Sequence, residues 1–180
     1  MLSGAGREDP RVYNSDIVAI DRTIDELDLH ILDILQSNAK ETQAEIARAV
    51  GLAPSAVLER VRKLEARGVI RGYIAQIDPK ALEQSMLAFV SVRSDEAPGN
   101  NDVARALAEC DEVLEVHHVA GEDCYMIKVR ARDPEHLGCL LRTRFGRIPG
   151  VRSTRTTIVL ETVKESPRLH ITRRRQEVAS

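Results

Sequence analysis

The side chains best suited to binding chemistry gather between residues 54 and 71. This stretch carries five basic and two acidic residues, a local charge of +3 in a chain whose formal net charge is −2. Arginine and lysine can hold the phosphates of DNA, whereas serine and glutamate can form hydrogen bonds with base edges. We therefore predict a DNA contact surface consisting of Ser55, Glu59, Arg60, Arg62 and Lys63.

A helix-turn-helix would position these side chains, and residues 42–69 carry its signals in the required order. Thr42 and Glu45 have the spacing of a capping box, which starts a helix. Gly51 can adopt the left-handed conformation that ends this helix, and Pro54 suits the first position of the next one. The stripes expected to be buried are Ile46, Ala49 and Val50, then Val57, Val61 and Leu64. The alternative is a plain helical hairpin whose charges are only solvated.

Composition limits the class of protein. The chain has 180 residues, of which 30% are charged and 43% hydrophobic, as in soluble globular proteins. No apolar run approaches the roughly 20 residues of a membrane span, and the N-terminus lacks the apolar core of a signal peptide. We therefore expect a cytoplasmic protein without a membrane partner. Cys110, Cys124 and Cys139 are odd in number and lack metal-ligand spacing, which favours reduced thiols.

Changes in residue type along the chain predict five parts. Residues 1–21 mix glycine, proline, aspartate and arginine and should form a flexible N-terminal arm. Residues 22–69 should hold the three helices of the helix-turn-helix domain. Residues 70–84, where apolar and polar residues alternate at the start, should form a strand or an extended linker. Residues 85–163 should form a second domain. Residues 164–180 should form a basic tail that is mainly a solvated, disordered end, with nonspecific phosphate contacts as the alternative.

The second domain alternates between strand and helix signals. We expect strand 86–93, a helix capped by Asn101, strands 113–120 and 124–131, a helix capped by Asp133, and strand 151–163 as the longest. This βαββαβ order predicts an α+β fold with an antiparallel four-stranded sheet and both helices on one face. The other face of the sheet would stay uncovered in a single chain, so we expect a homodimer.

His117, His118 and Cys124 could suggest a metal site. Neighbouring residues of a strand face opposite sides of the sheet, so the two histidines cannot easily bind the same ion. The sequence shows no paired carboxylates, nucleophile with a base, or phosphate-binding loop. We therefore expect no metal, no other cofactor and no enzymatic activity.

Four stretches of the sequence resemble the Lrp/AsnC family of leucine-responsive and asparagine-operon regulators. They are IDELDLHILDILQSNAK, AEIARAVGLAPSAVLERVRKLEARGVIRGYIAQIDPKAL, VAGEDCYMIKVRA and IPGVRSTRTTIVLETVK, and the resemblance spans about residues 22–163. The resemblance implies a winged helix-turn-helix joined by a strand to a ferredoxin-like effector domain. It also implies dimers formed through the sheets, their frequent assembly into octamers, and small molecules, commonly amino acids, bound between dimers.

An amino-acid effector would need donors for its carboxylate and an acceptor for its ammonium group. The turn at Gly121 offers backbone N–H groups, and Glu122 and Asp123 offer carboxylates. The hydroxyl groups expected to complete the site belong to Thr154, Thr156 and Thr157. The family often has Gly-Asp-Tyr-Asp at this turn, so a hairpin with exposed acids and no ligand is the alternative. The second helix of the helix-turn-helix, which begins at Pro54, also departs from the family pattern. Ala53 stands where the family usually has a serine cap, and Glu59 where it often has a basic residue.

Two interpretations of Glu59 stay open: it shapes the choice of DNA sequence, or Lys63 four residues on neutralises it. Two other functions also stay open. A sirohaem-decarboxylase-like enzyme could use His117, His118 and Arg155, and the purified protein would then show a porphyrin absorption band. A scaffold built on the effector domain would fail to bind the DNA upstream of its own gene at low salt.

Overall fold

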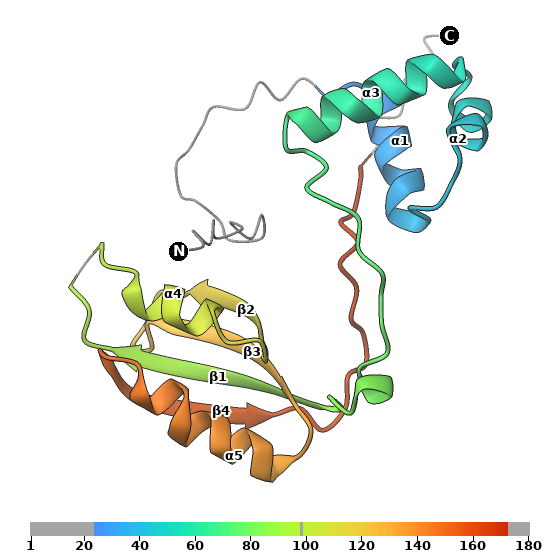
Figure 1. Cartoon of the computed structure of the whole chain (residues 1–180). Helices are drawn as coiled ribbons and strands as arrows, with labels where there is room; N and C mark the ends of the chain where they lie inside the picture. The colour runs from blue at the N-terminus through green and yellow to red at the C-terminus, as the bar shows by residue number, and fades with distance from the viewer. Residues whose placement is uncertain (1–23, 98, 173–180) are drawn as a thin grey trace, which may run out of the picture. The chain divides into compact units, whose positions relative to one another are not determined.

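The computed structural model describes residues 24–97 and 99–172. The predicted arm at residues 1–21 lies outside this part of the chain, as do residues 173–180 of the basic tail. Figure 1 shows two compact units, one formed by the described residues up to Ala75 and from Glu165 onward, the other by Gln76–Lys164. Among the helices of the described residues, none has both the length and the apolar character of a membrane span.

Three helices make up the first unit: α1 (Glu26–Ser37), α2 (Gln43–Val50) and α3 (Pro54–Ala66). α1 begins after Asp25, whose side chain accepts a hydrogen bond from the N–H of Asp28. The helices pack through their apolar stripes because each stripe can leave water only against the others. The core that they share consists of Ile31, Ile46, Ala47, Val50, Val57 and Val61.

The start and end of α2 follow the local sequence signals. The N–H of Glu45 donates to Thr42 Oγ1 at 3.2 Å, and the N–H of Thr42 donates to Glu45 Oε2 at 2.8 Å, which confirms the capping box. Gly51 ends the helix with a φ of 74°, in the left-handed region. The prediction for Ala49 is wrong: it is exposed, and Ala47 is buried in its place.

Of the two predictions for the segment after α3, the strand does not form and the extended linker does. Gly68 follows the helix with a φ of 68°, and residues 70–78 then run without regular structure to a short 3₁₀ turn at Pro79–Leu82. A strand needs a ladder partner, and no described segment of the chain pairs with this one. Ile70 is half-buried against the core of the helical unit, whereas the side chains of residues 71–78 are exposed. The Tyr73 hydroxyl donates to Glu65 at 2.9 Å.

The chain returns to α1 after the second unit. Leu169 exchanges two hydrogen bonds with the Gln36 side chain, its N–H donating to Oε1 at 2.8 Å and its carbonyl accepting from Nε2 at 3.3 Å. Arg168 forms an ion pair with Asp33 at 2.6 Å. The basic tail is therefore not solvated throughout, because these residues attach its first part to the helical unit.

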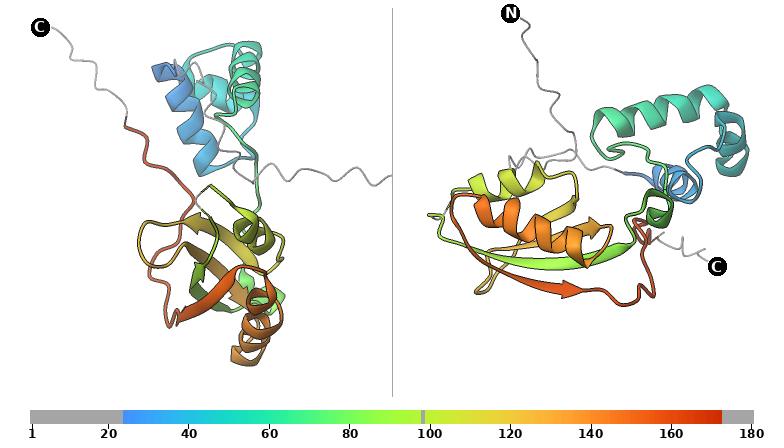
Figure 2. Two further views of the ribbon diagram at one scale, coloured as in Figure 1. Left: turned by 90° about the vertical axis from the view of Figure 1, so that its left-hand side faces the viewer. Right: turned by 60° about the horizontal axis from the view of Figure 1, so that its bottom comes forward.

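The second unit has the predicted βαββαβ order. Its elements are β1 (Met86–Ser94), α4 (Asp102–Ala108), β2 (Val113–His118), β3 (Tyr125–Ala131), α5 (Pro134–Thr143) and β4 (Val151–Ile158). The strands form one antiparallel sheet in the order β2-β3-β1-β4. Both helices lie over the same face of this sheet (Figure 2). Alternate residues of β1 and β3 pack against them, among them Val90, Val92 and Ile127.

The cap of α4 differs from the prediction. The side chain of Asn101 forms no capping hydrogen bond. Glu96 instead accepts from the N–H of Val103 at 2.9 Å, and Asn100 accepts from the N–H of Asp102 at 3.2 Å. Glu96 precedes Val103 by seven residues, so the spacing of a normal helix cap could not identify it as the acceptor.

The last strand is shorter than predicted. β4 ends at Ile158, opposite Ala88, and β1 is the longest strand of the sheet. Among the strands of the described residues, only β1 pairs with β4, and β1 begins two residues before Ala88. The N–H of Val159 still donates to the Leu87 carbonyl at 2.9 Å, and residues after Leu160 have no residue of β1 opposite them.

Alanine at position 51 should destabilise the helical unit by about 1–2 kcal/mol, because a side chain is strained in the left-handed conformation. Gly138→Ala is the matched control, since Gly138 lies within α5 and an added Cβ would meet only the end of the Arg142 side chain. Urea denaturation followed by circular dichroism measures both. A Gly51→Ala protein as stable as the Gly138→Ala protein would contradict the assigned turn.

Candidate nucleic-acid interface

α3 has a buried face and a polar outer face. Val57, Val61 and Leu64 are nearly inaccessible to solvent, which fixes the rotation of the helix about its axis. The opposite positions are exposed, and the predicted DNA-binding residues among them are Ser55, Glu59, Arg62 and Lys63. The helix can therefore present these four side chains to a groove of DNA without unpacking.

The start of α3 lacks a side-chain cap. Ala53 occupies the capping position and forms no side-chain hydrogen bond, and Pro54 has no N–H to satisfy. The first turn also contains no acidic residue. The positive end of the helix dipole is thus not neutralised by its own first turn, a property that favours contact with phosphate.

Glu59 and Lys63 form an ion pair on the outer face of α3. Lys63 Nζ lies 2.6 Å from Glu59 Oε1, and both side chains are about two-thirds exposed. The hydrogen bond and the charge of Lys63 lower the pKa of the Glu59 carboxyl, so Glu59 is ionised at neutral pH. An exposed pair of this kind is weak and can open when either partner meets DNA.

The side chain of Arg60 points away from the outer face that carries the other four predicted residues. Its guanidinium turns toward the start of α1, where Nη1 lies 2.6 Å from Asp25 Oδ2 and 2.7 Å from Asp28 Oδ1. The hydrogen bonds to the two carboxylates raise the pKa of Arg60, and the bond to Asp28 has the larger effect. Sequence reasoning missed both aspartates because they precede Arg60 by more than thirty residues.

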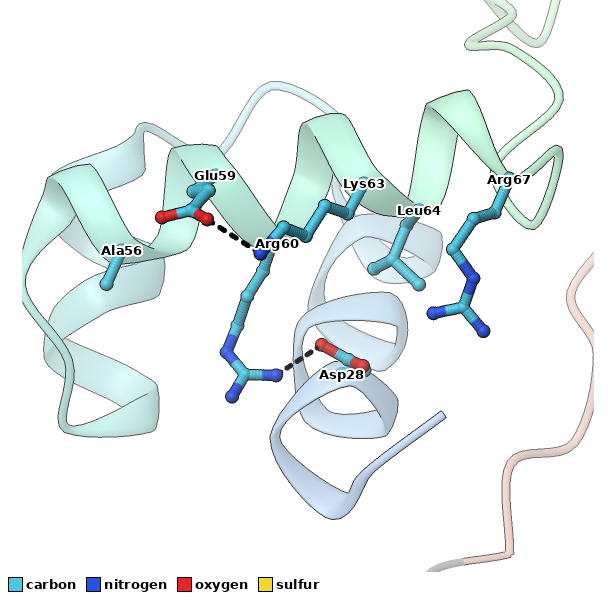
Figure 3. A pocket seen from close by; sticks show the side chains of 7 residues that line it. All are labelled: Asp28, Ala56, Glu59, Arg60, Lys63, Leu64 and Arg67. Atoms are coloured by element: carbon cyan, nitrogen blue, oxygen red, sulfur yellow. Dashed lines mark hydrogen bonds and ion pairs between the residues drawn. The ribbon is translucent and has the colours of Figure 1, made fainter. Parts of the chain in front are cut away.

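A shallow hollow of about 260 Å³ lies along this side of α3 (Figure 3). Its lining consists of Asp28, Ala56, Glu59, Arg60, Lys63, Leu64 and Arg67. Figure 3 shows Arg60 reaching down to Asp28, while Glu59 and Lys63 pair along the upper surface of the helix. The hollow is open and its edges are charged, as expected for a surface that meets a polyanion rather than a cavity for a small molecule.

The predicted effector residues of the second unit fall into two groups. Asp123, in the turn before β3, pairs with Arg155 on β4 at 2.6 Å. Gly121 has a φ of 142°, and Glu122 next to it is exposed. Sequence reasoning did not include Arg155 in this site, because only the sheet brings β4 beside the turn.

The three threonines of β4 do not converge. Thr154 lies opposite Val92 and Thr156 opposite Val90, so both face the helix-covered side of the sheet. Thr157 faces the open side, because neighbouring residues of a strand alternate. A single small ligand therefore cannot contact all three hydroxyl groups from one side.

The histidines of β2 likewise face opposite sides of the sheet. His117 Nε2 lies 3.1 Å from Glu115 Oε2, whereas the ring of His118 lies 5.2 Å from that of Tyr125. Within residues 24–97 and 99–172, no three histidine, cysteine or acidic side chains come together as a metal site would require.

Comparisons with known proteins find matches to both units of the chain. Residues 24–71 match the family model described as winged helix-turn-helix DNA-binding, and residues 87–169 match that of the Lrp/AsnC ligand binding domain. The HTH-type transcriptional regulator FL11 of Pyrococcus horikoshii is 43% identical over 148 residues, which cover 82% of this chain and 97% of the relative. The leucine-responsive regulatory protein of Escherichia coli K12 is 38% identical, covering 83% and 93%.

A solved structure is similar over both units. The feast or famine regulatory protein of M. tuberculosis, complexed with L-methionine, has a TM-score of 0.76 and 37% sequence identity. The match covers 83% of this chain and 99% of that one. The predicted fold class, a winged helix-turn-helix domain with a βαββαβ domain, is thus confirmed by sequence and by structure.

Proposed function

The chain belongs to the Lrp/AsnC family of transcriptional regulators, and we propose that it lays α3 of each subunit of a dimer in the major groove of duplex DNA. The matched relatives are named as regulators, so the chain is a DNA-binding regulator and not an enzyme. Its helix-turn-helix domain disfavours a scaffold without DNA. Because its partner is DNA, we infer that it is cytoplasmic.

One observation carries this proposal: α3 exposes a polar, basic face while its apolar face is buried. Arg62 and Lys63 can reach phosphates from the outer face, and Ser55 and Glu59 can reach base edges near the start of the helix. Two such helices in a symmetric dimer would enter successive major grooves about one helical turn apart. Phosphate contacts would supply most of the affinity, and Ser55 and Glu59 the choice of sequence.

We infer that a second copy covers the open face of the sheet. Phe89 and Met126, at 38% and 40% exposure, lie on the face opposite the helices. An exposed apolar sheet face of this kind is typical of an interface between proteins. The family resemblance further supports assembly of dimers into an octamer, which would multiply DNA contacts through effective concentration.

An amino-acid effector fits the ion pair between Asp123 and Arg155. An amino-acid zwitterion carries an ammonium group that can pair with the carboxylate of Asp123 and a carboxylate that can pair with the guanidinium of Arg155. The ligand can therefore take the place of the ion pair and leave neither side chain without an opposite charge. The turn at Gly121 would add backbone N–H groups. The L-methionine complex of the M. tuberculosis relative supports this ligand class. A ligand bound between dimers would shift their assembly only by its difference in affinity for the two forms.

Arg62→Ala should weaken binding to every DNA sequence and reduce the slope of log K against log salt concentration by about 0.9, the loss of one phosphate contact. Glu59→Ala should instead change the order in which sequences bind. Fluorescence anisotropy with a panel of duplexes, each titrated with salt, measures both quantities. Arg142→Ala, on the exposed side of α5, is the control for loss of one positive charge. Equal losses on every sequence for Arg62→Ala and Glu59→Ala would contradict the assigned roles.

The double variant Phe89→Asp/Met126→Asp should be a monomer at micromolar concentration, because burying an unpaired carboxylate strongly disfavours the interface. Light scattering after gel filtration gives the mass. Ala108→Asp is the control, since Ala108 is exposed on α4, away from the open face. A wild-type chain that is monomeric, or a double variant that stays dimeric, would show that the sheet face is not the interface.

Calorimetry against the twenty amino acids should detect binding of at least one of them, and Asp123→Ala should abolish the signal because the ammonium group loses its partner. Asp111→Ala removes an exposed acid elsewhere on the same unit and should leave binding intact. The absence of heat with all twenty amino acids would rule out this effector class and leave the turn as an unliganded hairpin.

A further inference from the structure

Arg60 lies in the middle of the DNA-reading helix, yet its charge is engaged within the domain. Its side chain is 30% exposed, whereas that of Asp28, its partner on α1, is only 9% exposed. A single nitrogen, Nη1, lies 2.6 Å from a carboxylate oxygen of Asp25 and 2.7 Å from one of Asp28. Such short charge-assisted hydrogen bonds are stronger than neutral ones and depend on direction.

The two aspartates also form the capping box of α1, and their oxygens divide between the two tasks. Asp25 Oδ1 accepts from the N–H of Asp28, and Asp28 Oδ2 accepts from the N–H of Asp25. The remaining oxygens, Asp25 Oδ2 and Asp28 Oδ1, accept from Arg60. The first turn of α1 and the middle of α3 are thereby joined in one closed hydrogen-bonded network.

Apolar packing alone leaves the orientation of α3 less well defined. Val57, Val61 and Leu64 hold the helix against the core, but hydrophobic contact has no direction and tolerates small rotations. The bonds from Arg60 add a directional constraint on the side next to the outer face. A rotation of α3 would break them and leave the nearly buried carboxylate of Asp28 without its cationic partner, which is costly.

We propose that Arg60 is a positioning residue, which fixes α3 against the capping box of α1 and so sets the angle at which Ser55, Glu59 and Arg62 meet DNA, without itself holding a phosphate. This inference rests on the proposed DNA binding. It replaces the expectation from the sequence that Arg60 pairs with phosphate. The two roles differ in a measurable way, because only a phosphate contact contributes to counterion release.

The test compares Arg60→Gln, Asp28→Asn and Arg62→Gln in salt titrations of DNA binding by the full chain, with a panel of duplexes that includes one from upstream of its own gene. Arg60→Gln should lower affinity by about tenfold or more on every sequence and keep the wild-type salt slope. Arg62→Gln should reduce that slope by about 0.9. All affinities are measured well below the unfolding temperature and corrected for the folded fraction by circular dichroism.

The Asp28→Asn variant distinguishes loss of the hydrogen-bonded network from loss of a negative charge near DNA. Removing an acid close to DNA should tighten binding if only electrostatic repulsion mattered, whereas loss of the network should weaken binding, as in Arg60→Gln. The double variant Arg60→Gln/Asp28→Asn should be no weaker than the weaker single variant, because both changes break the same network. Additive losses would count against the proposal.

Arg60→Lys covers the case in which Arg60→Gln fails to fold. It keeps the positive charge but cannot reproduce the reach of the guanidinium, so affinity should fall with the slope unchanged. Wild-type affinity in Arg60→Lys, a slope reduced in Arg60→Gln as much as in Arg62→Gln, or tighter binding by Asp28→Asn would each overturn the positioning role. If the wild-type chain binds no duplex at low salt, DNA binding itself fails, and that result is distinct from all of these.

Discussion

The proposed DNA-reading surface depends on the burial of one face of α3. Val57, Val61 and Leu64 point into the helical unit, and this burial determines which side chains face outward. The core beneath them is small, and two of its members, Ile31 and Ile46, come from α1 and α2. Any change that loosens this packing therefore changes the direction of Ser55 and Glu59 as well as the stability of the domain. Affinity and fold are coupled through the same few contacts.

The charge of this surface differs from the net charge of the whole chain. The formal net charge is −2, which by itself disfavours a DNA ligand, but Arg62 and Lys63 gather on the exposed face of one helix. The acids nearby are each engaged: Glu59 pairs with Lys63, and the aspartates at the start of α1 with Arg60. Ion pairing reduces the repulsion that these carboxylates would exert on phosphate, and Arg62 stays exposed on the outer face of α3.

Features set by near neighbours in the chain could be predicted from the sequence, and those set by distant partners could not. The capping box at Thr42, the left-handed Gly51 and the order of the second unit follow from signals a few residues apart. Residues 70–78 have the alternation of a strand but find no ladder partner in the described chain. The inward turn of Arg60 and the pair between Asp123 and Arg155 exist only once helices or strands lie side by side. Residue type predicted which helix face would meet DNA, but only the fold shows the orientation of each side chain on it.

Hydroxyl-radical footprinting of the wild-type protein on the DNA upstream of its own gene tests the central claim most directly, namely that α3 enters the major groove as part of a symmetric pair. The account predicts protection in patches about one helical turn apart on the same side of the duplex, which weaken together as salt is raised. Absence of protection at low salt, or patches whose spacing no pair of helices related by two-fold symmetry could span, would contradict it.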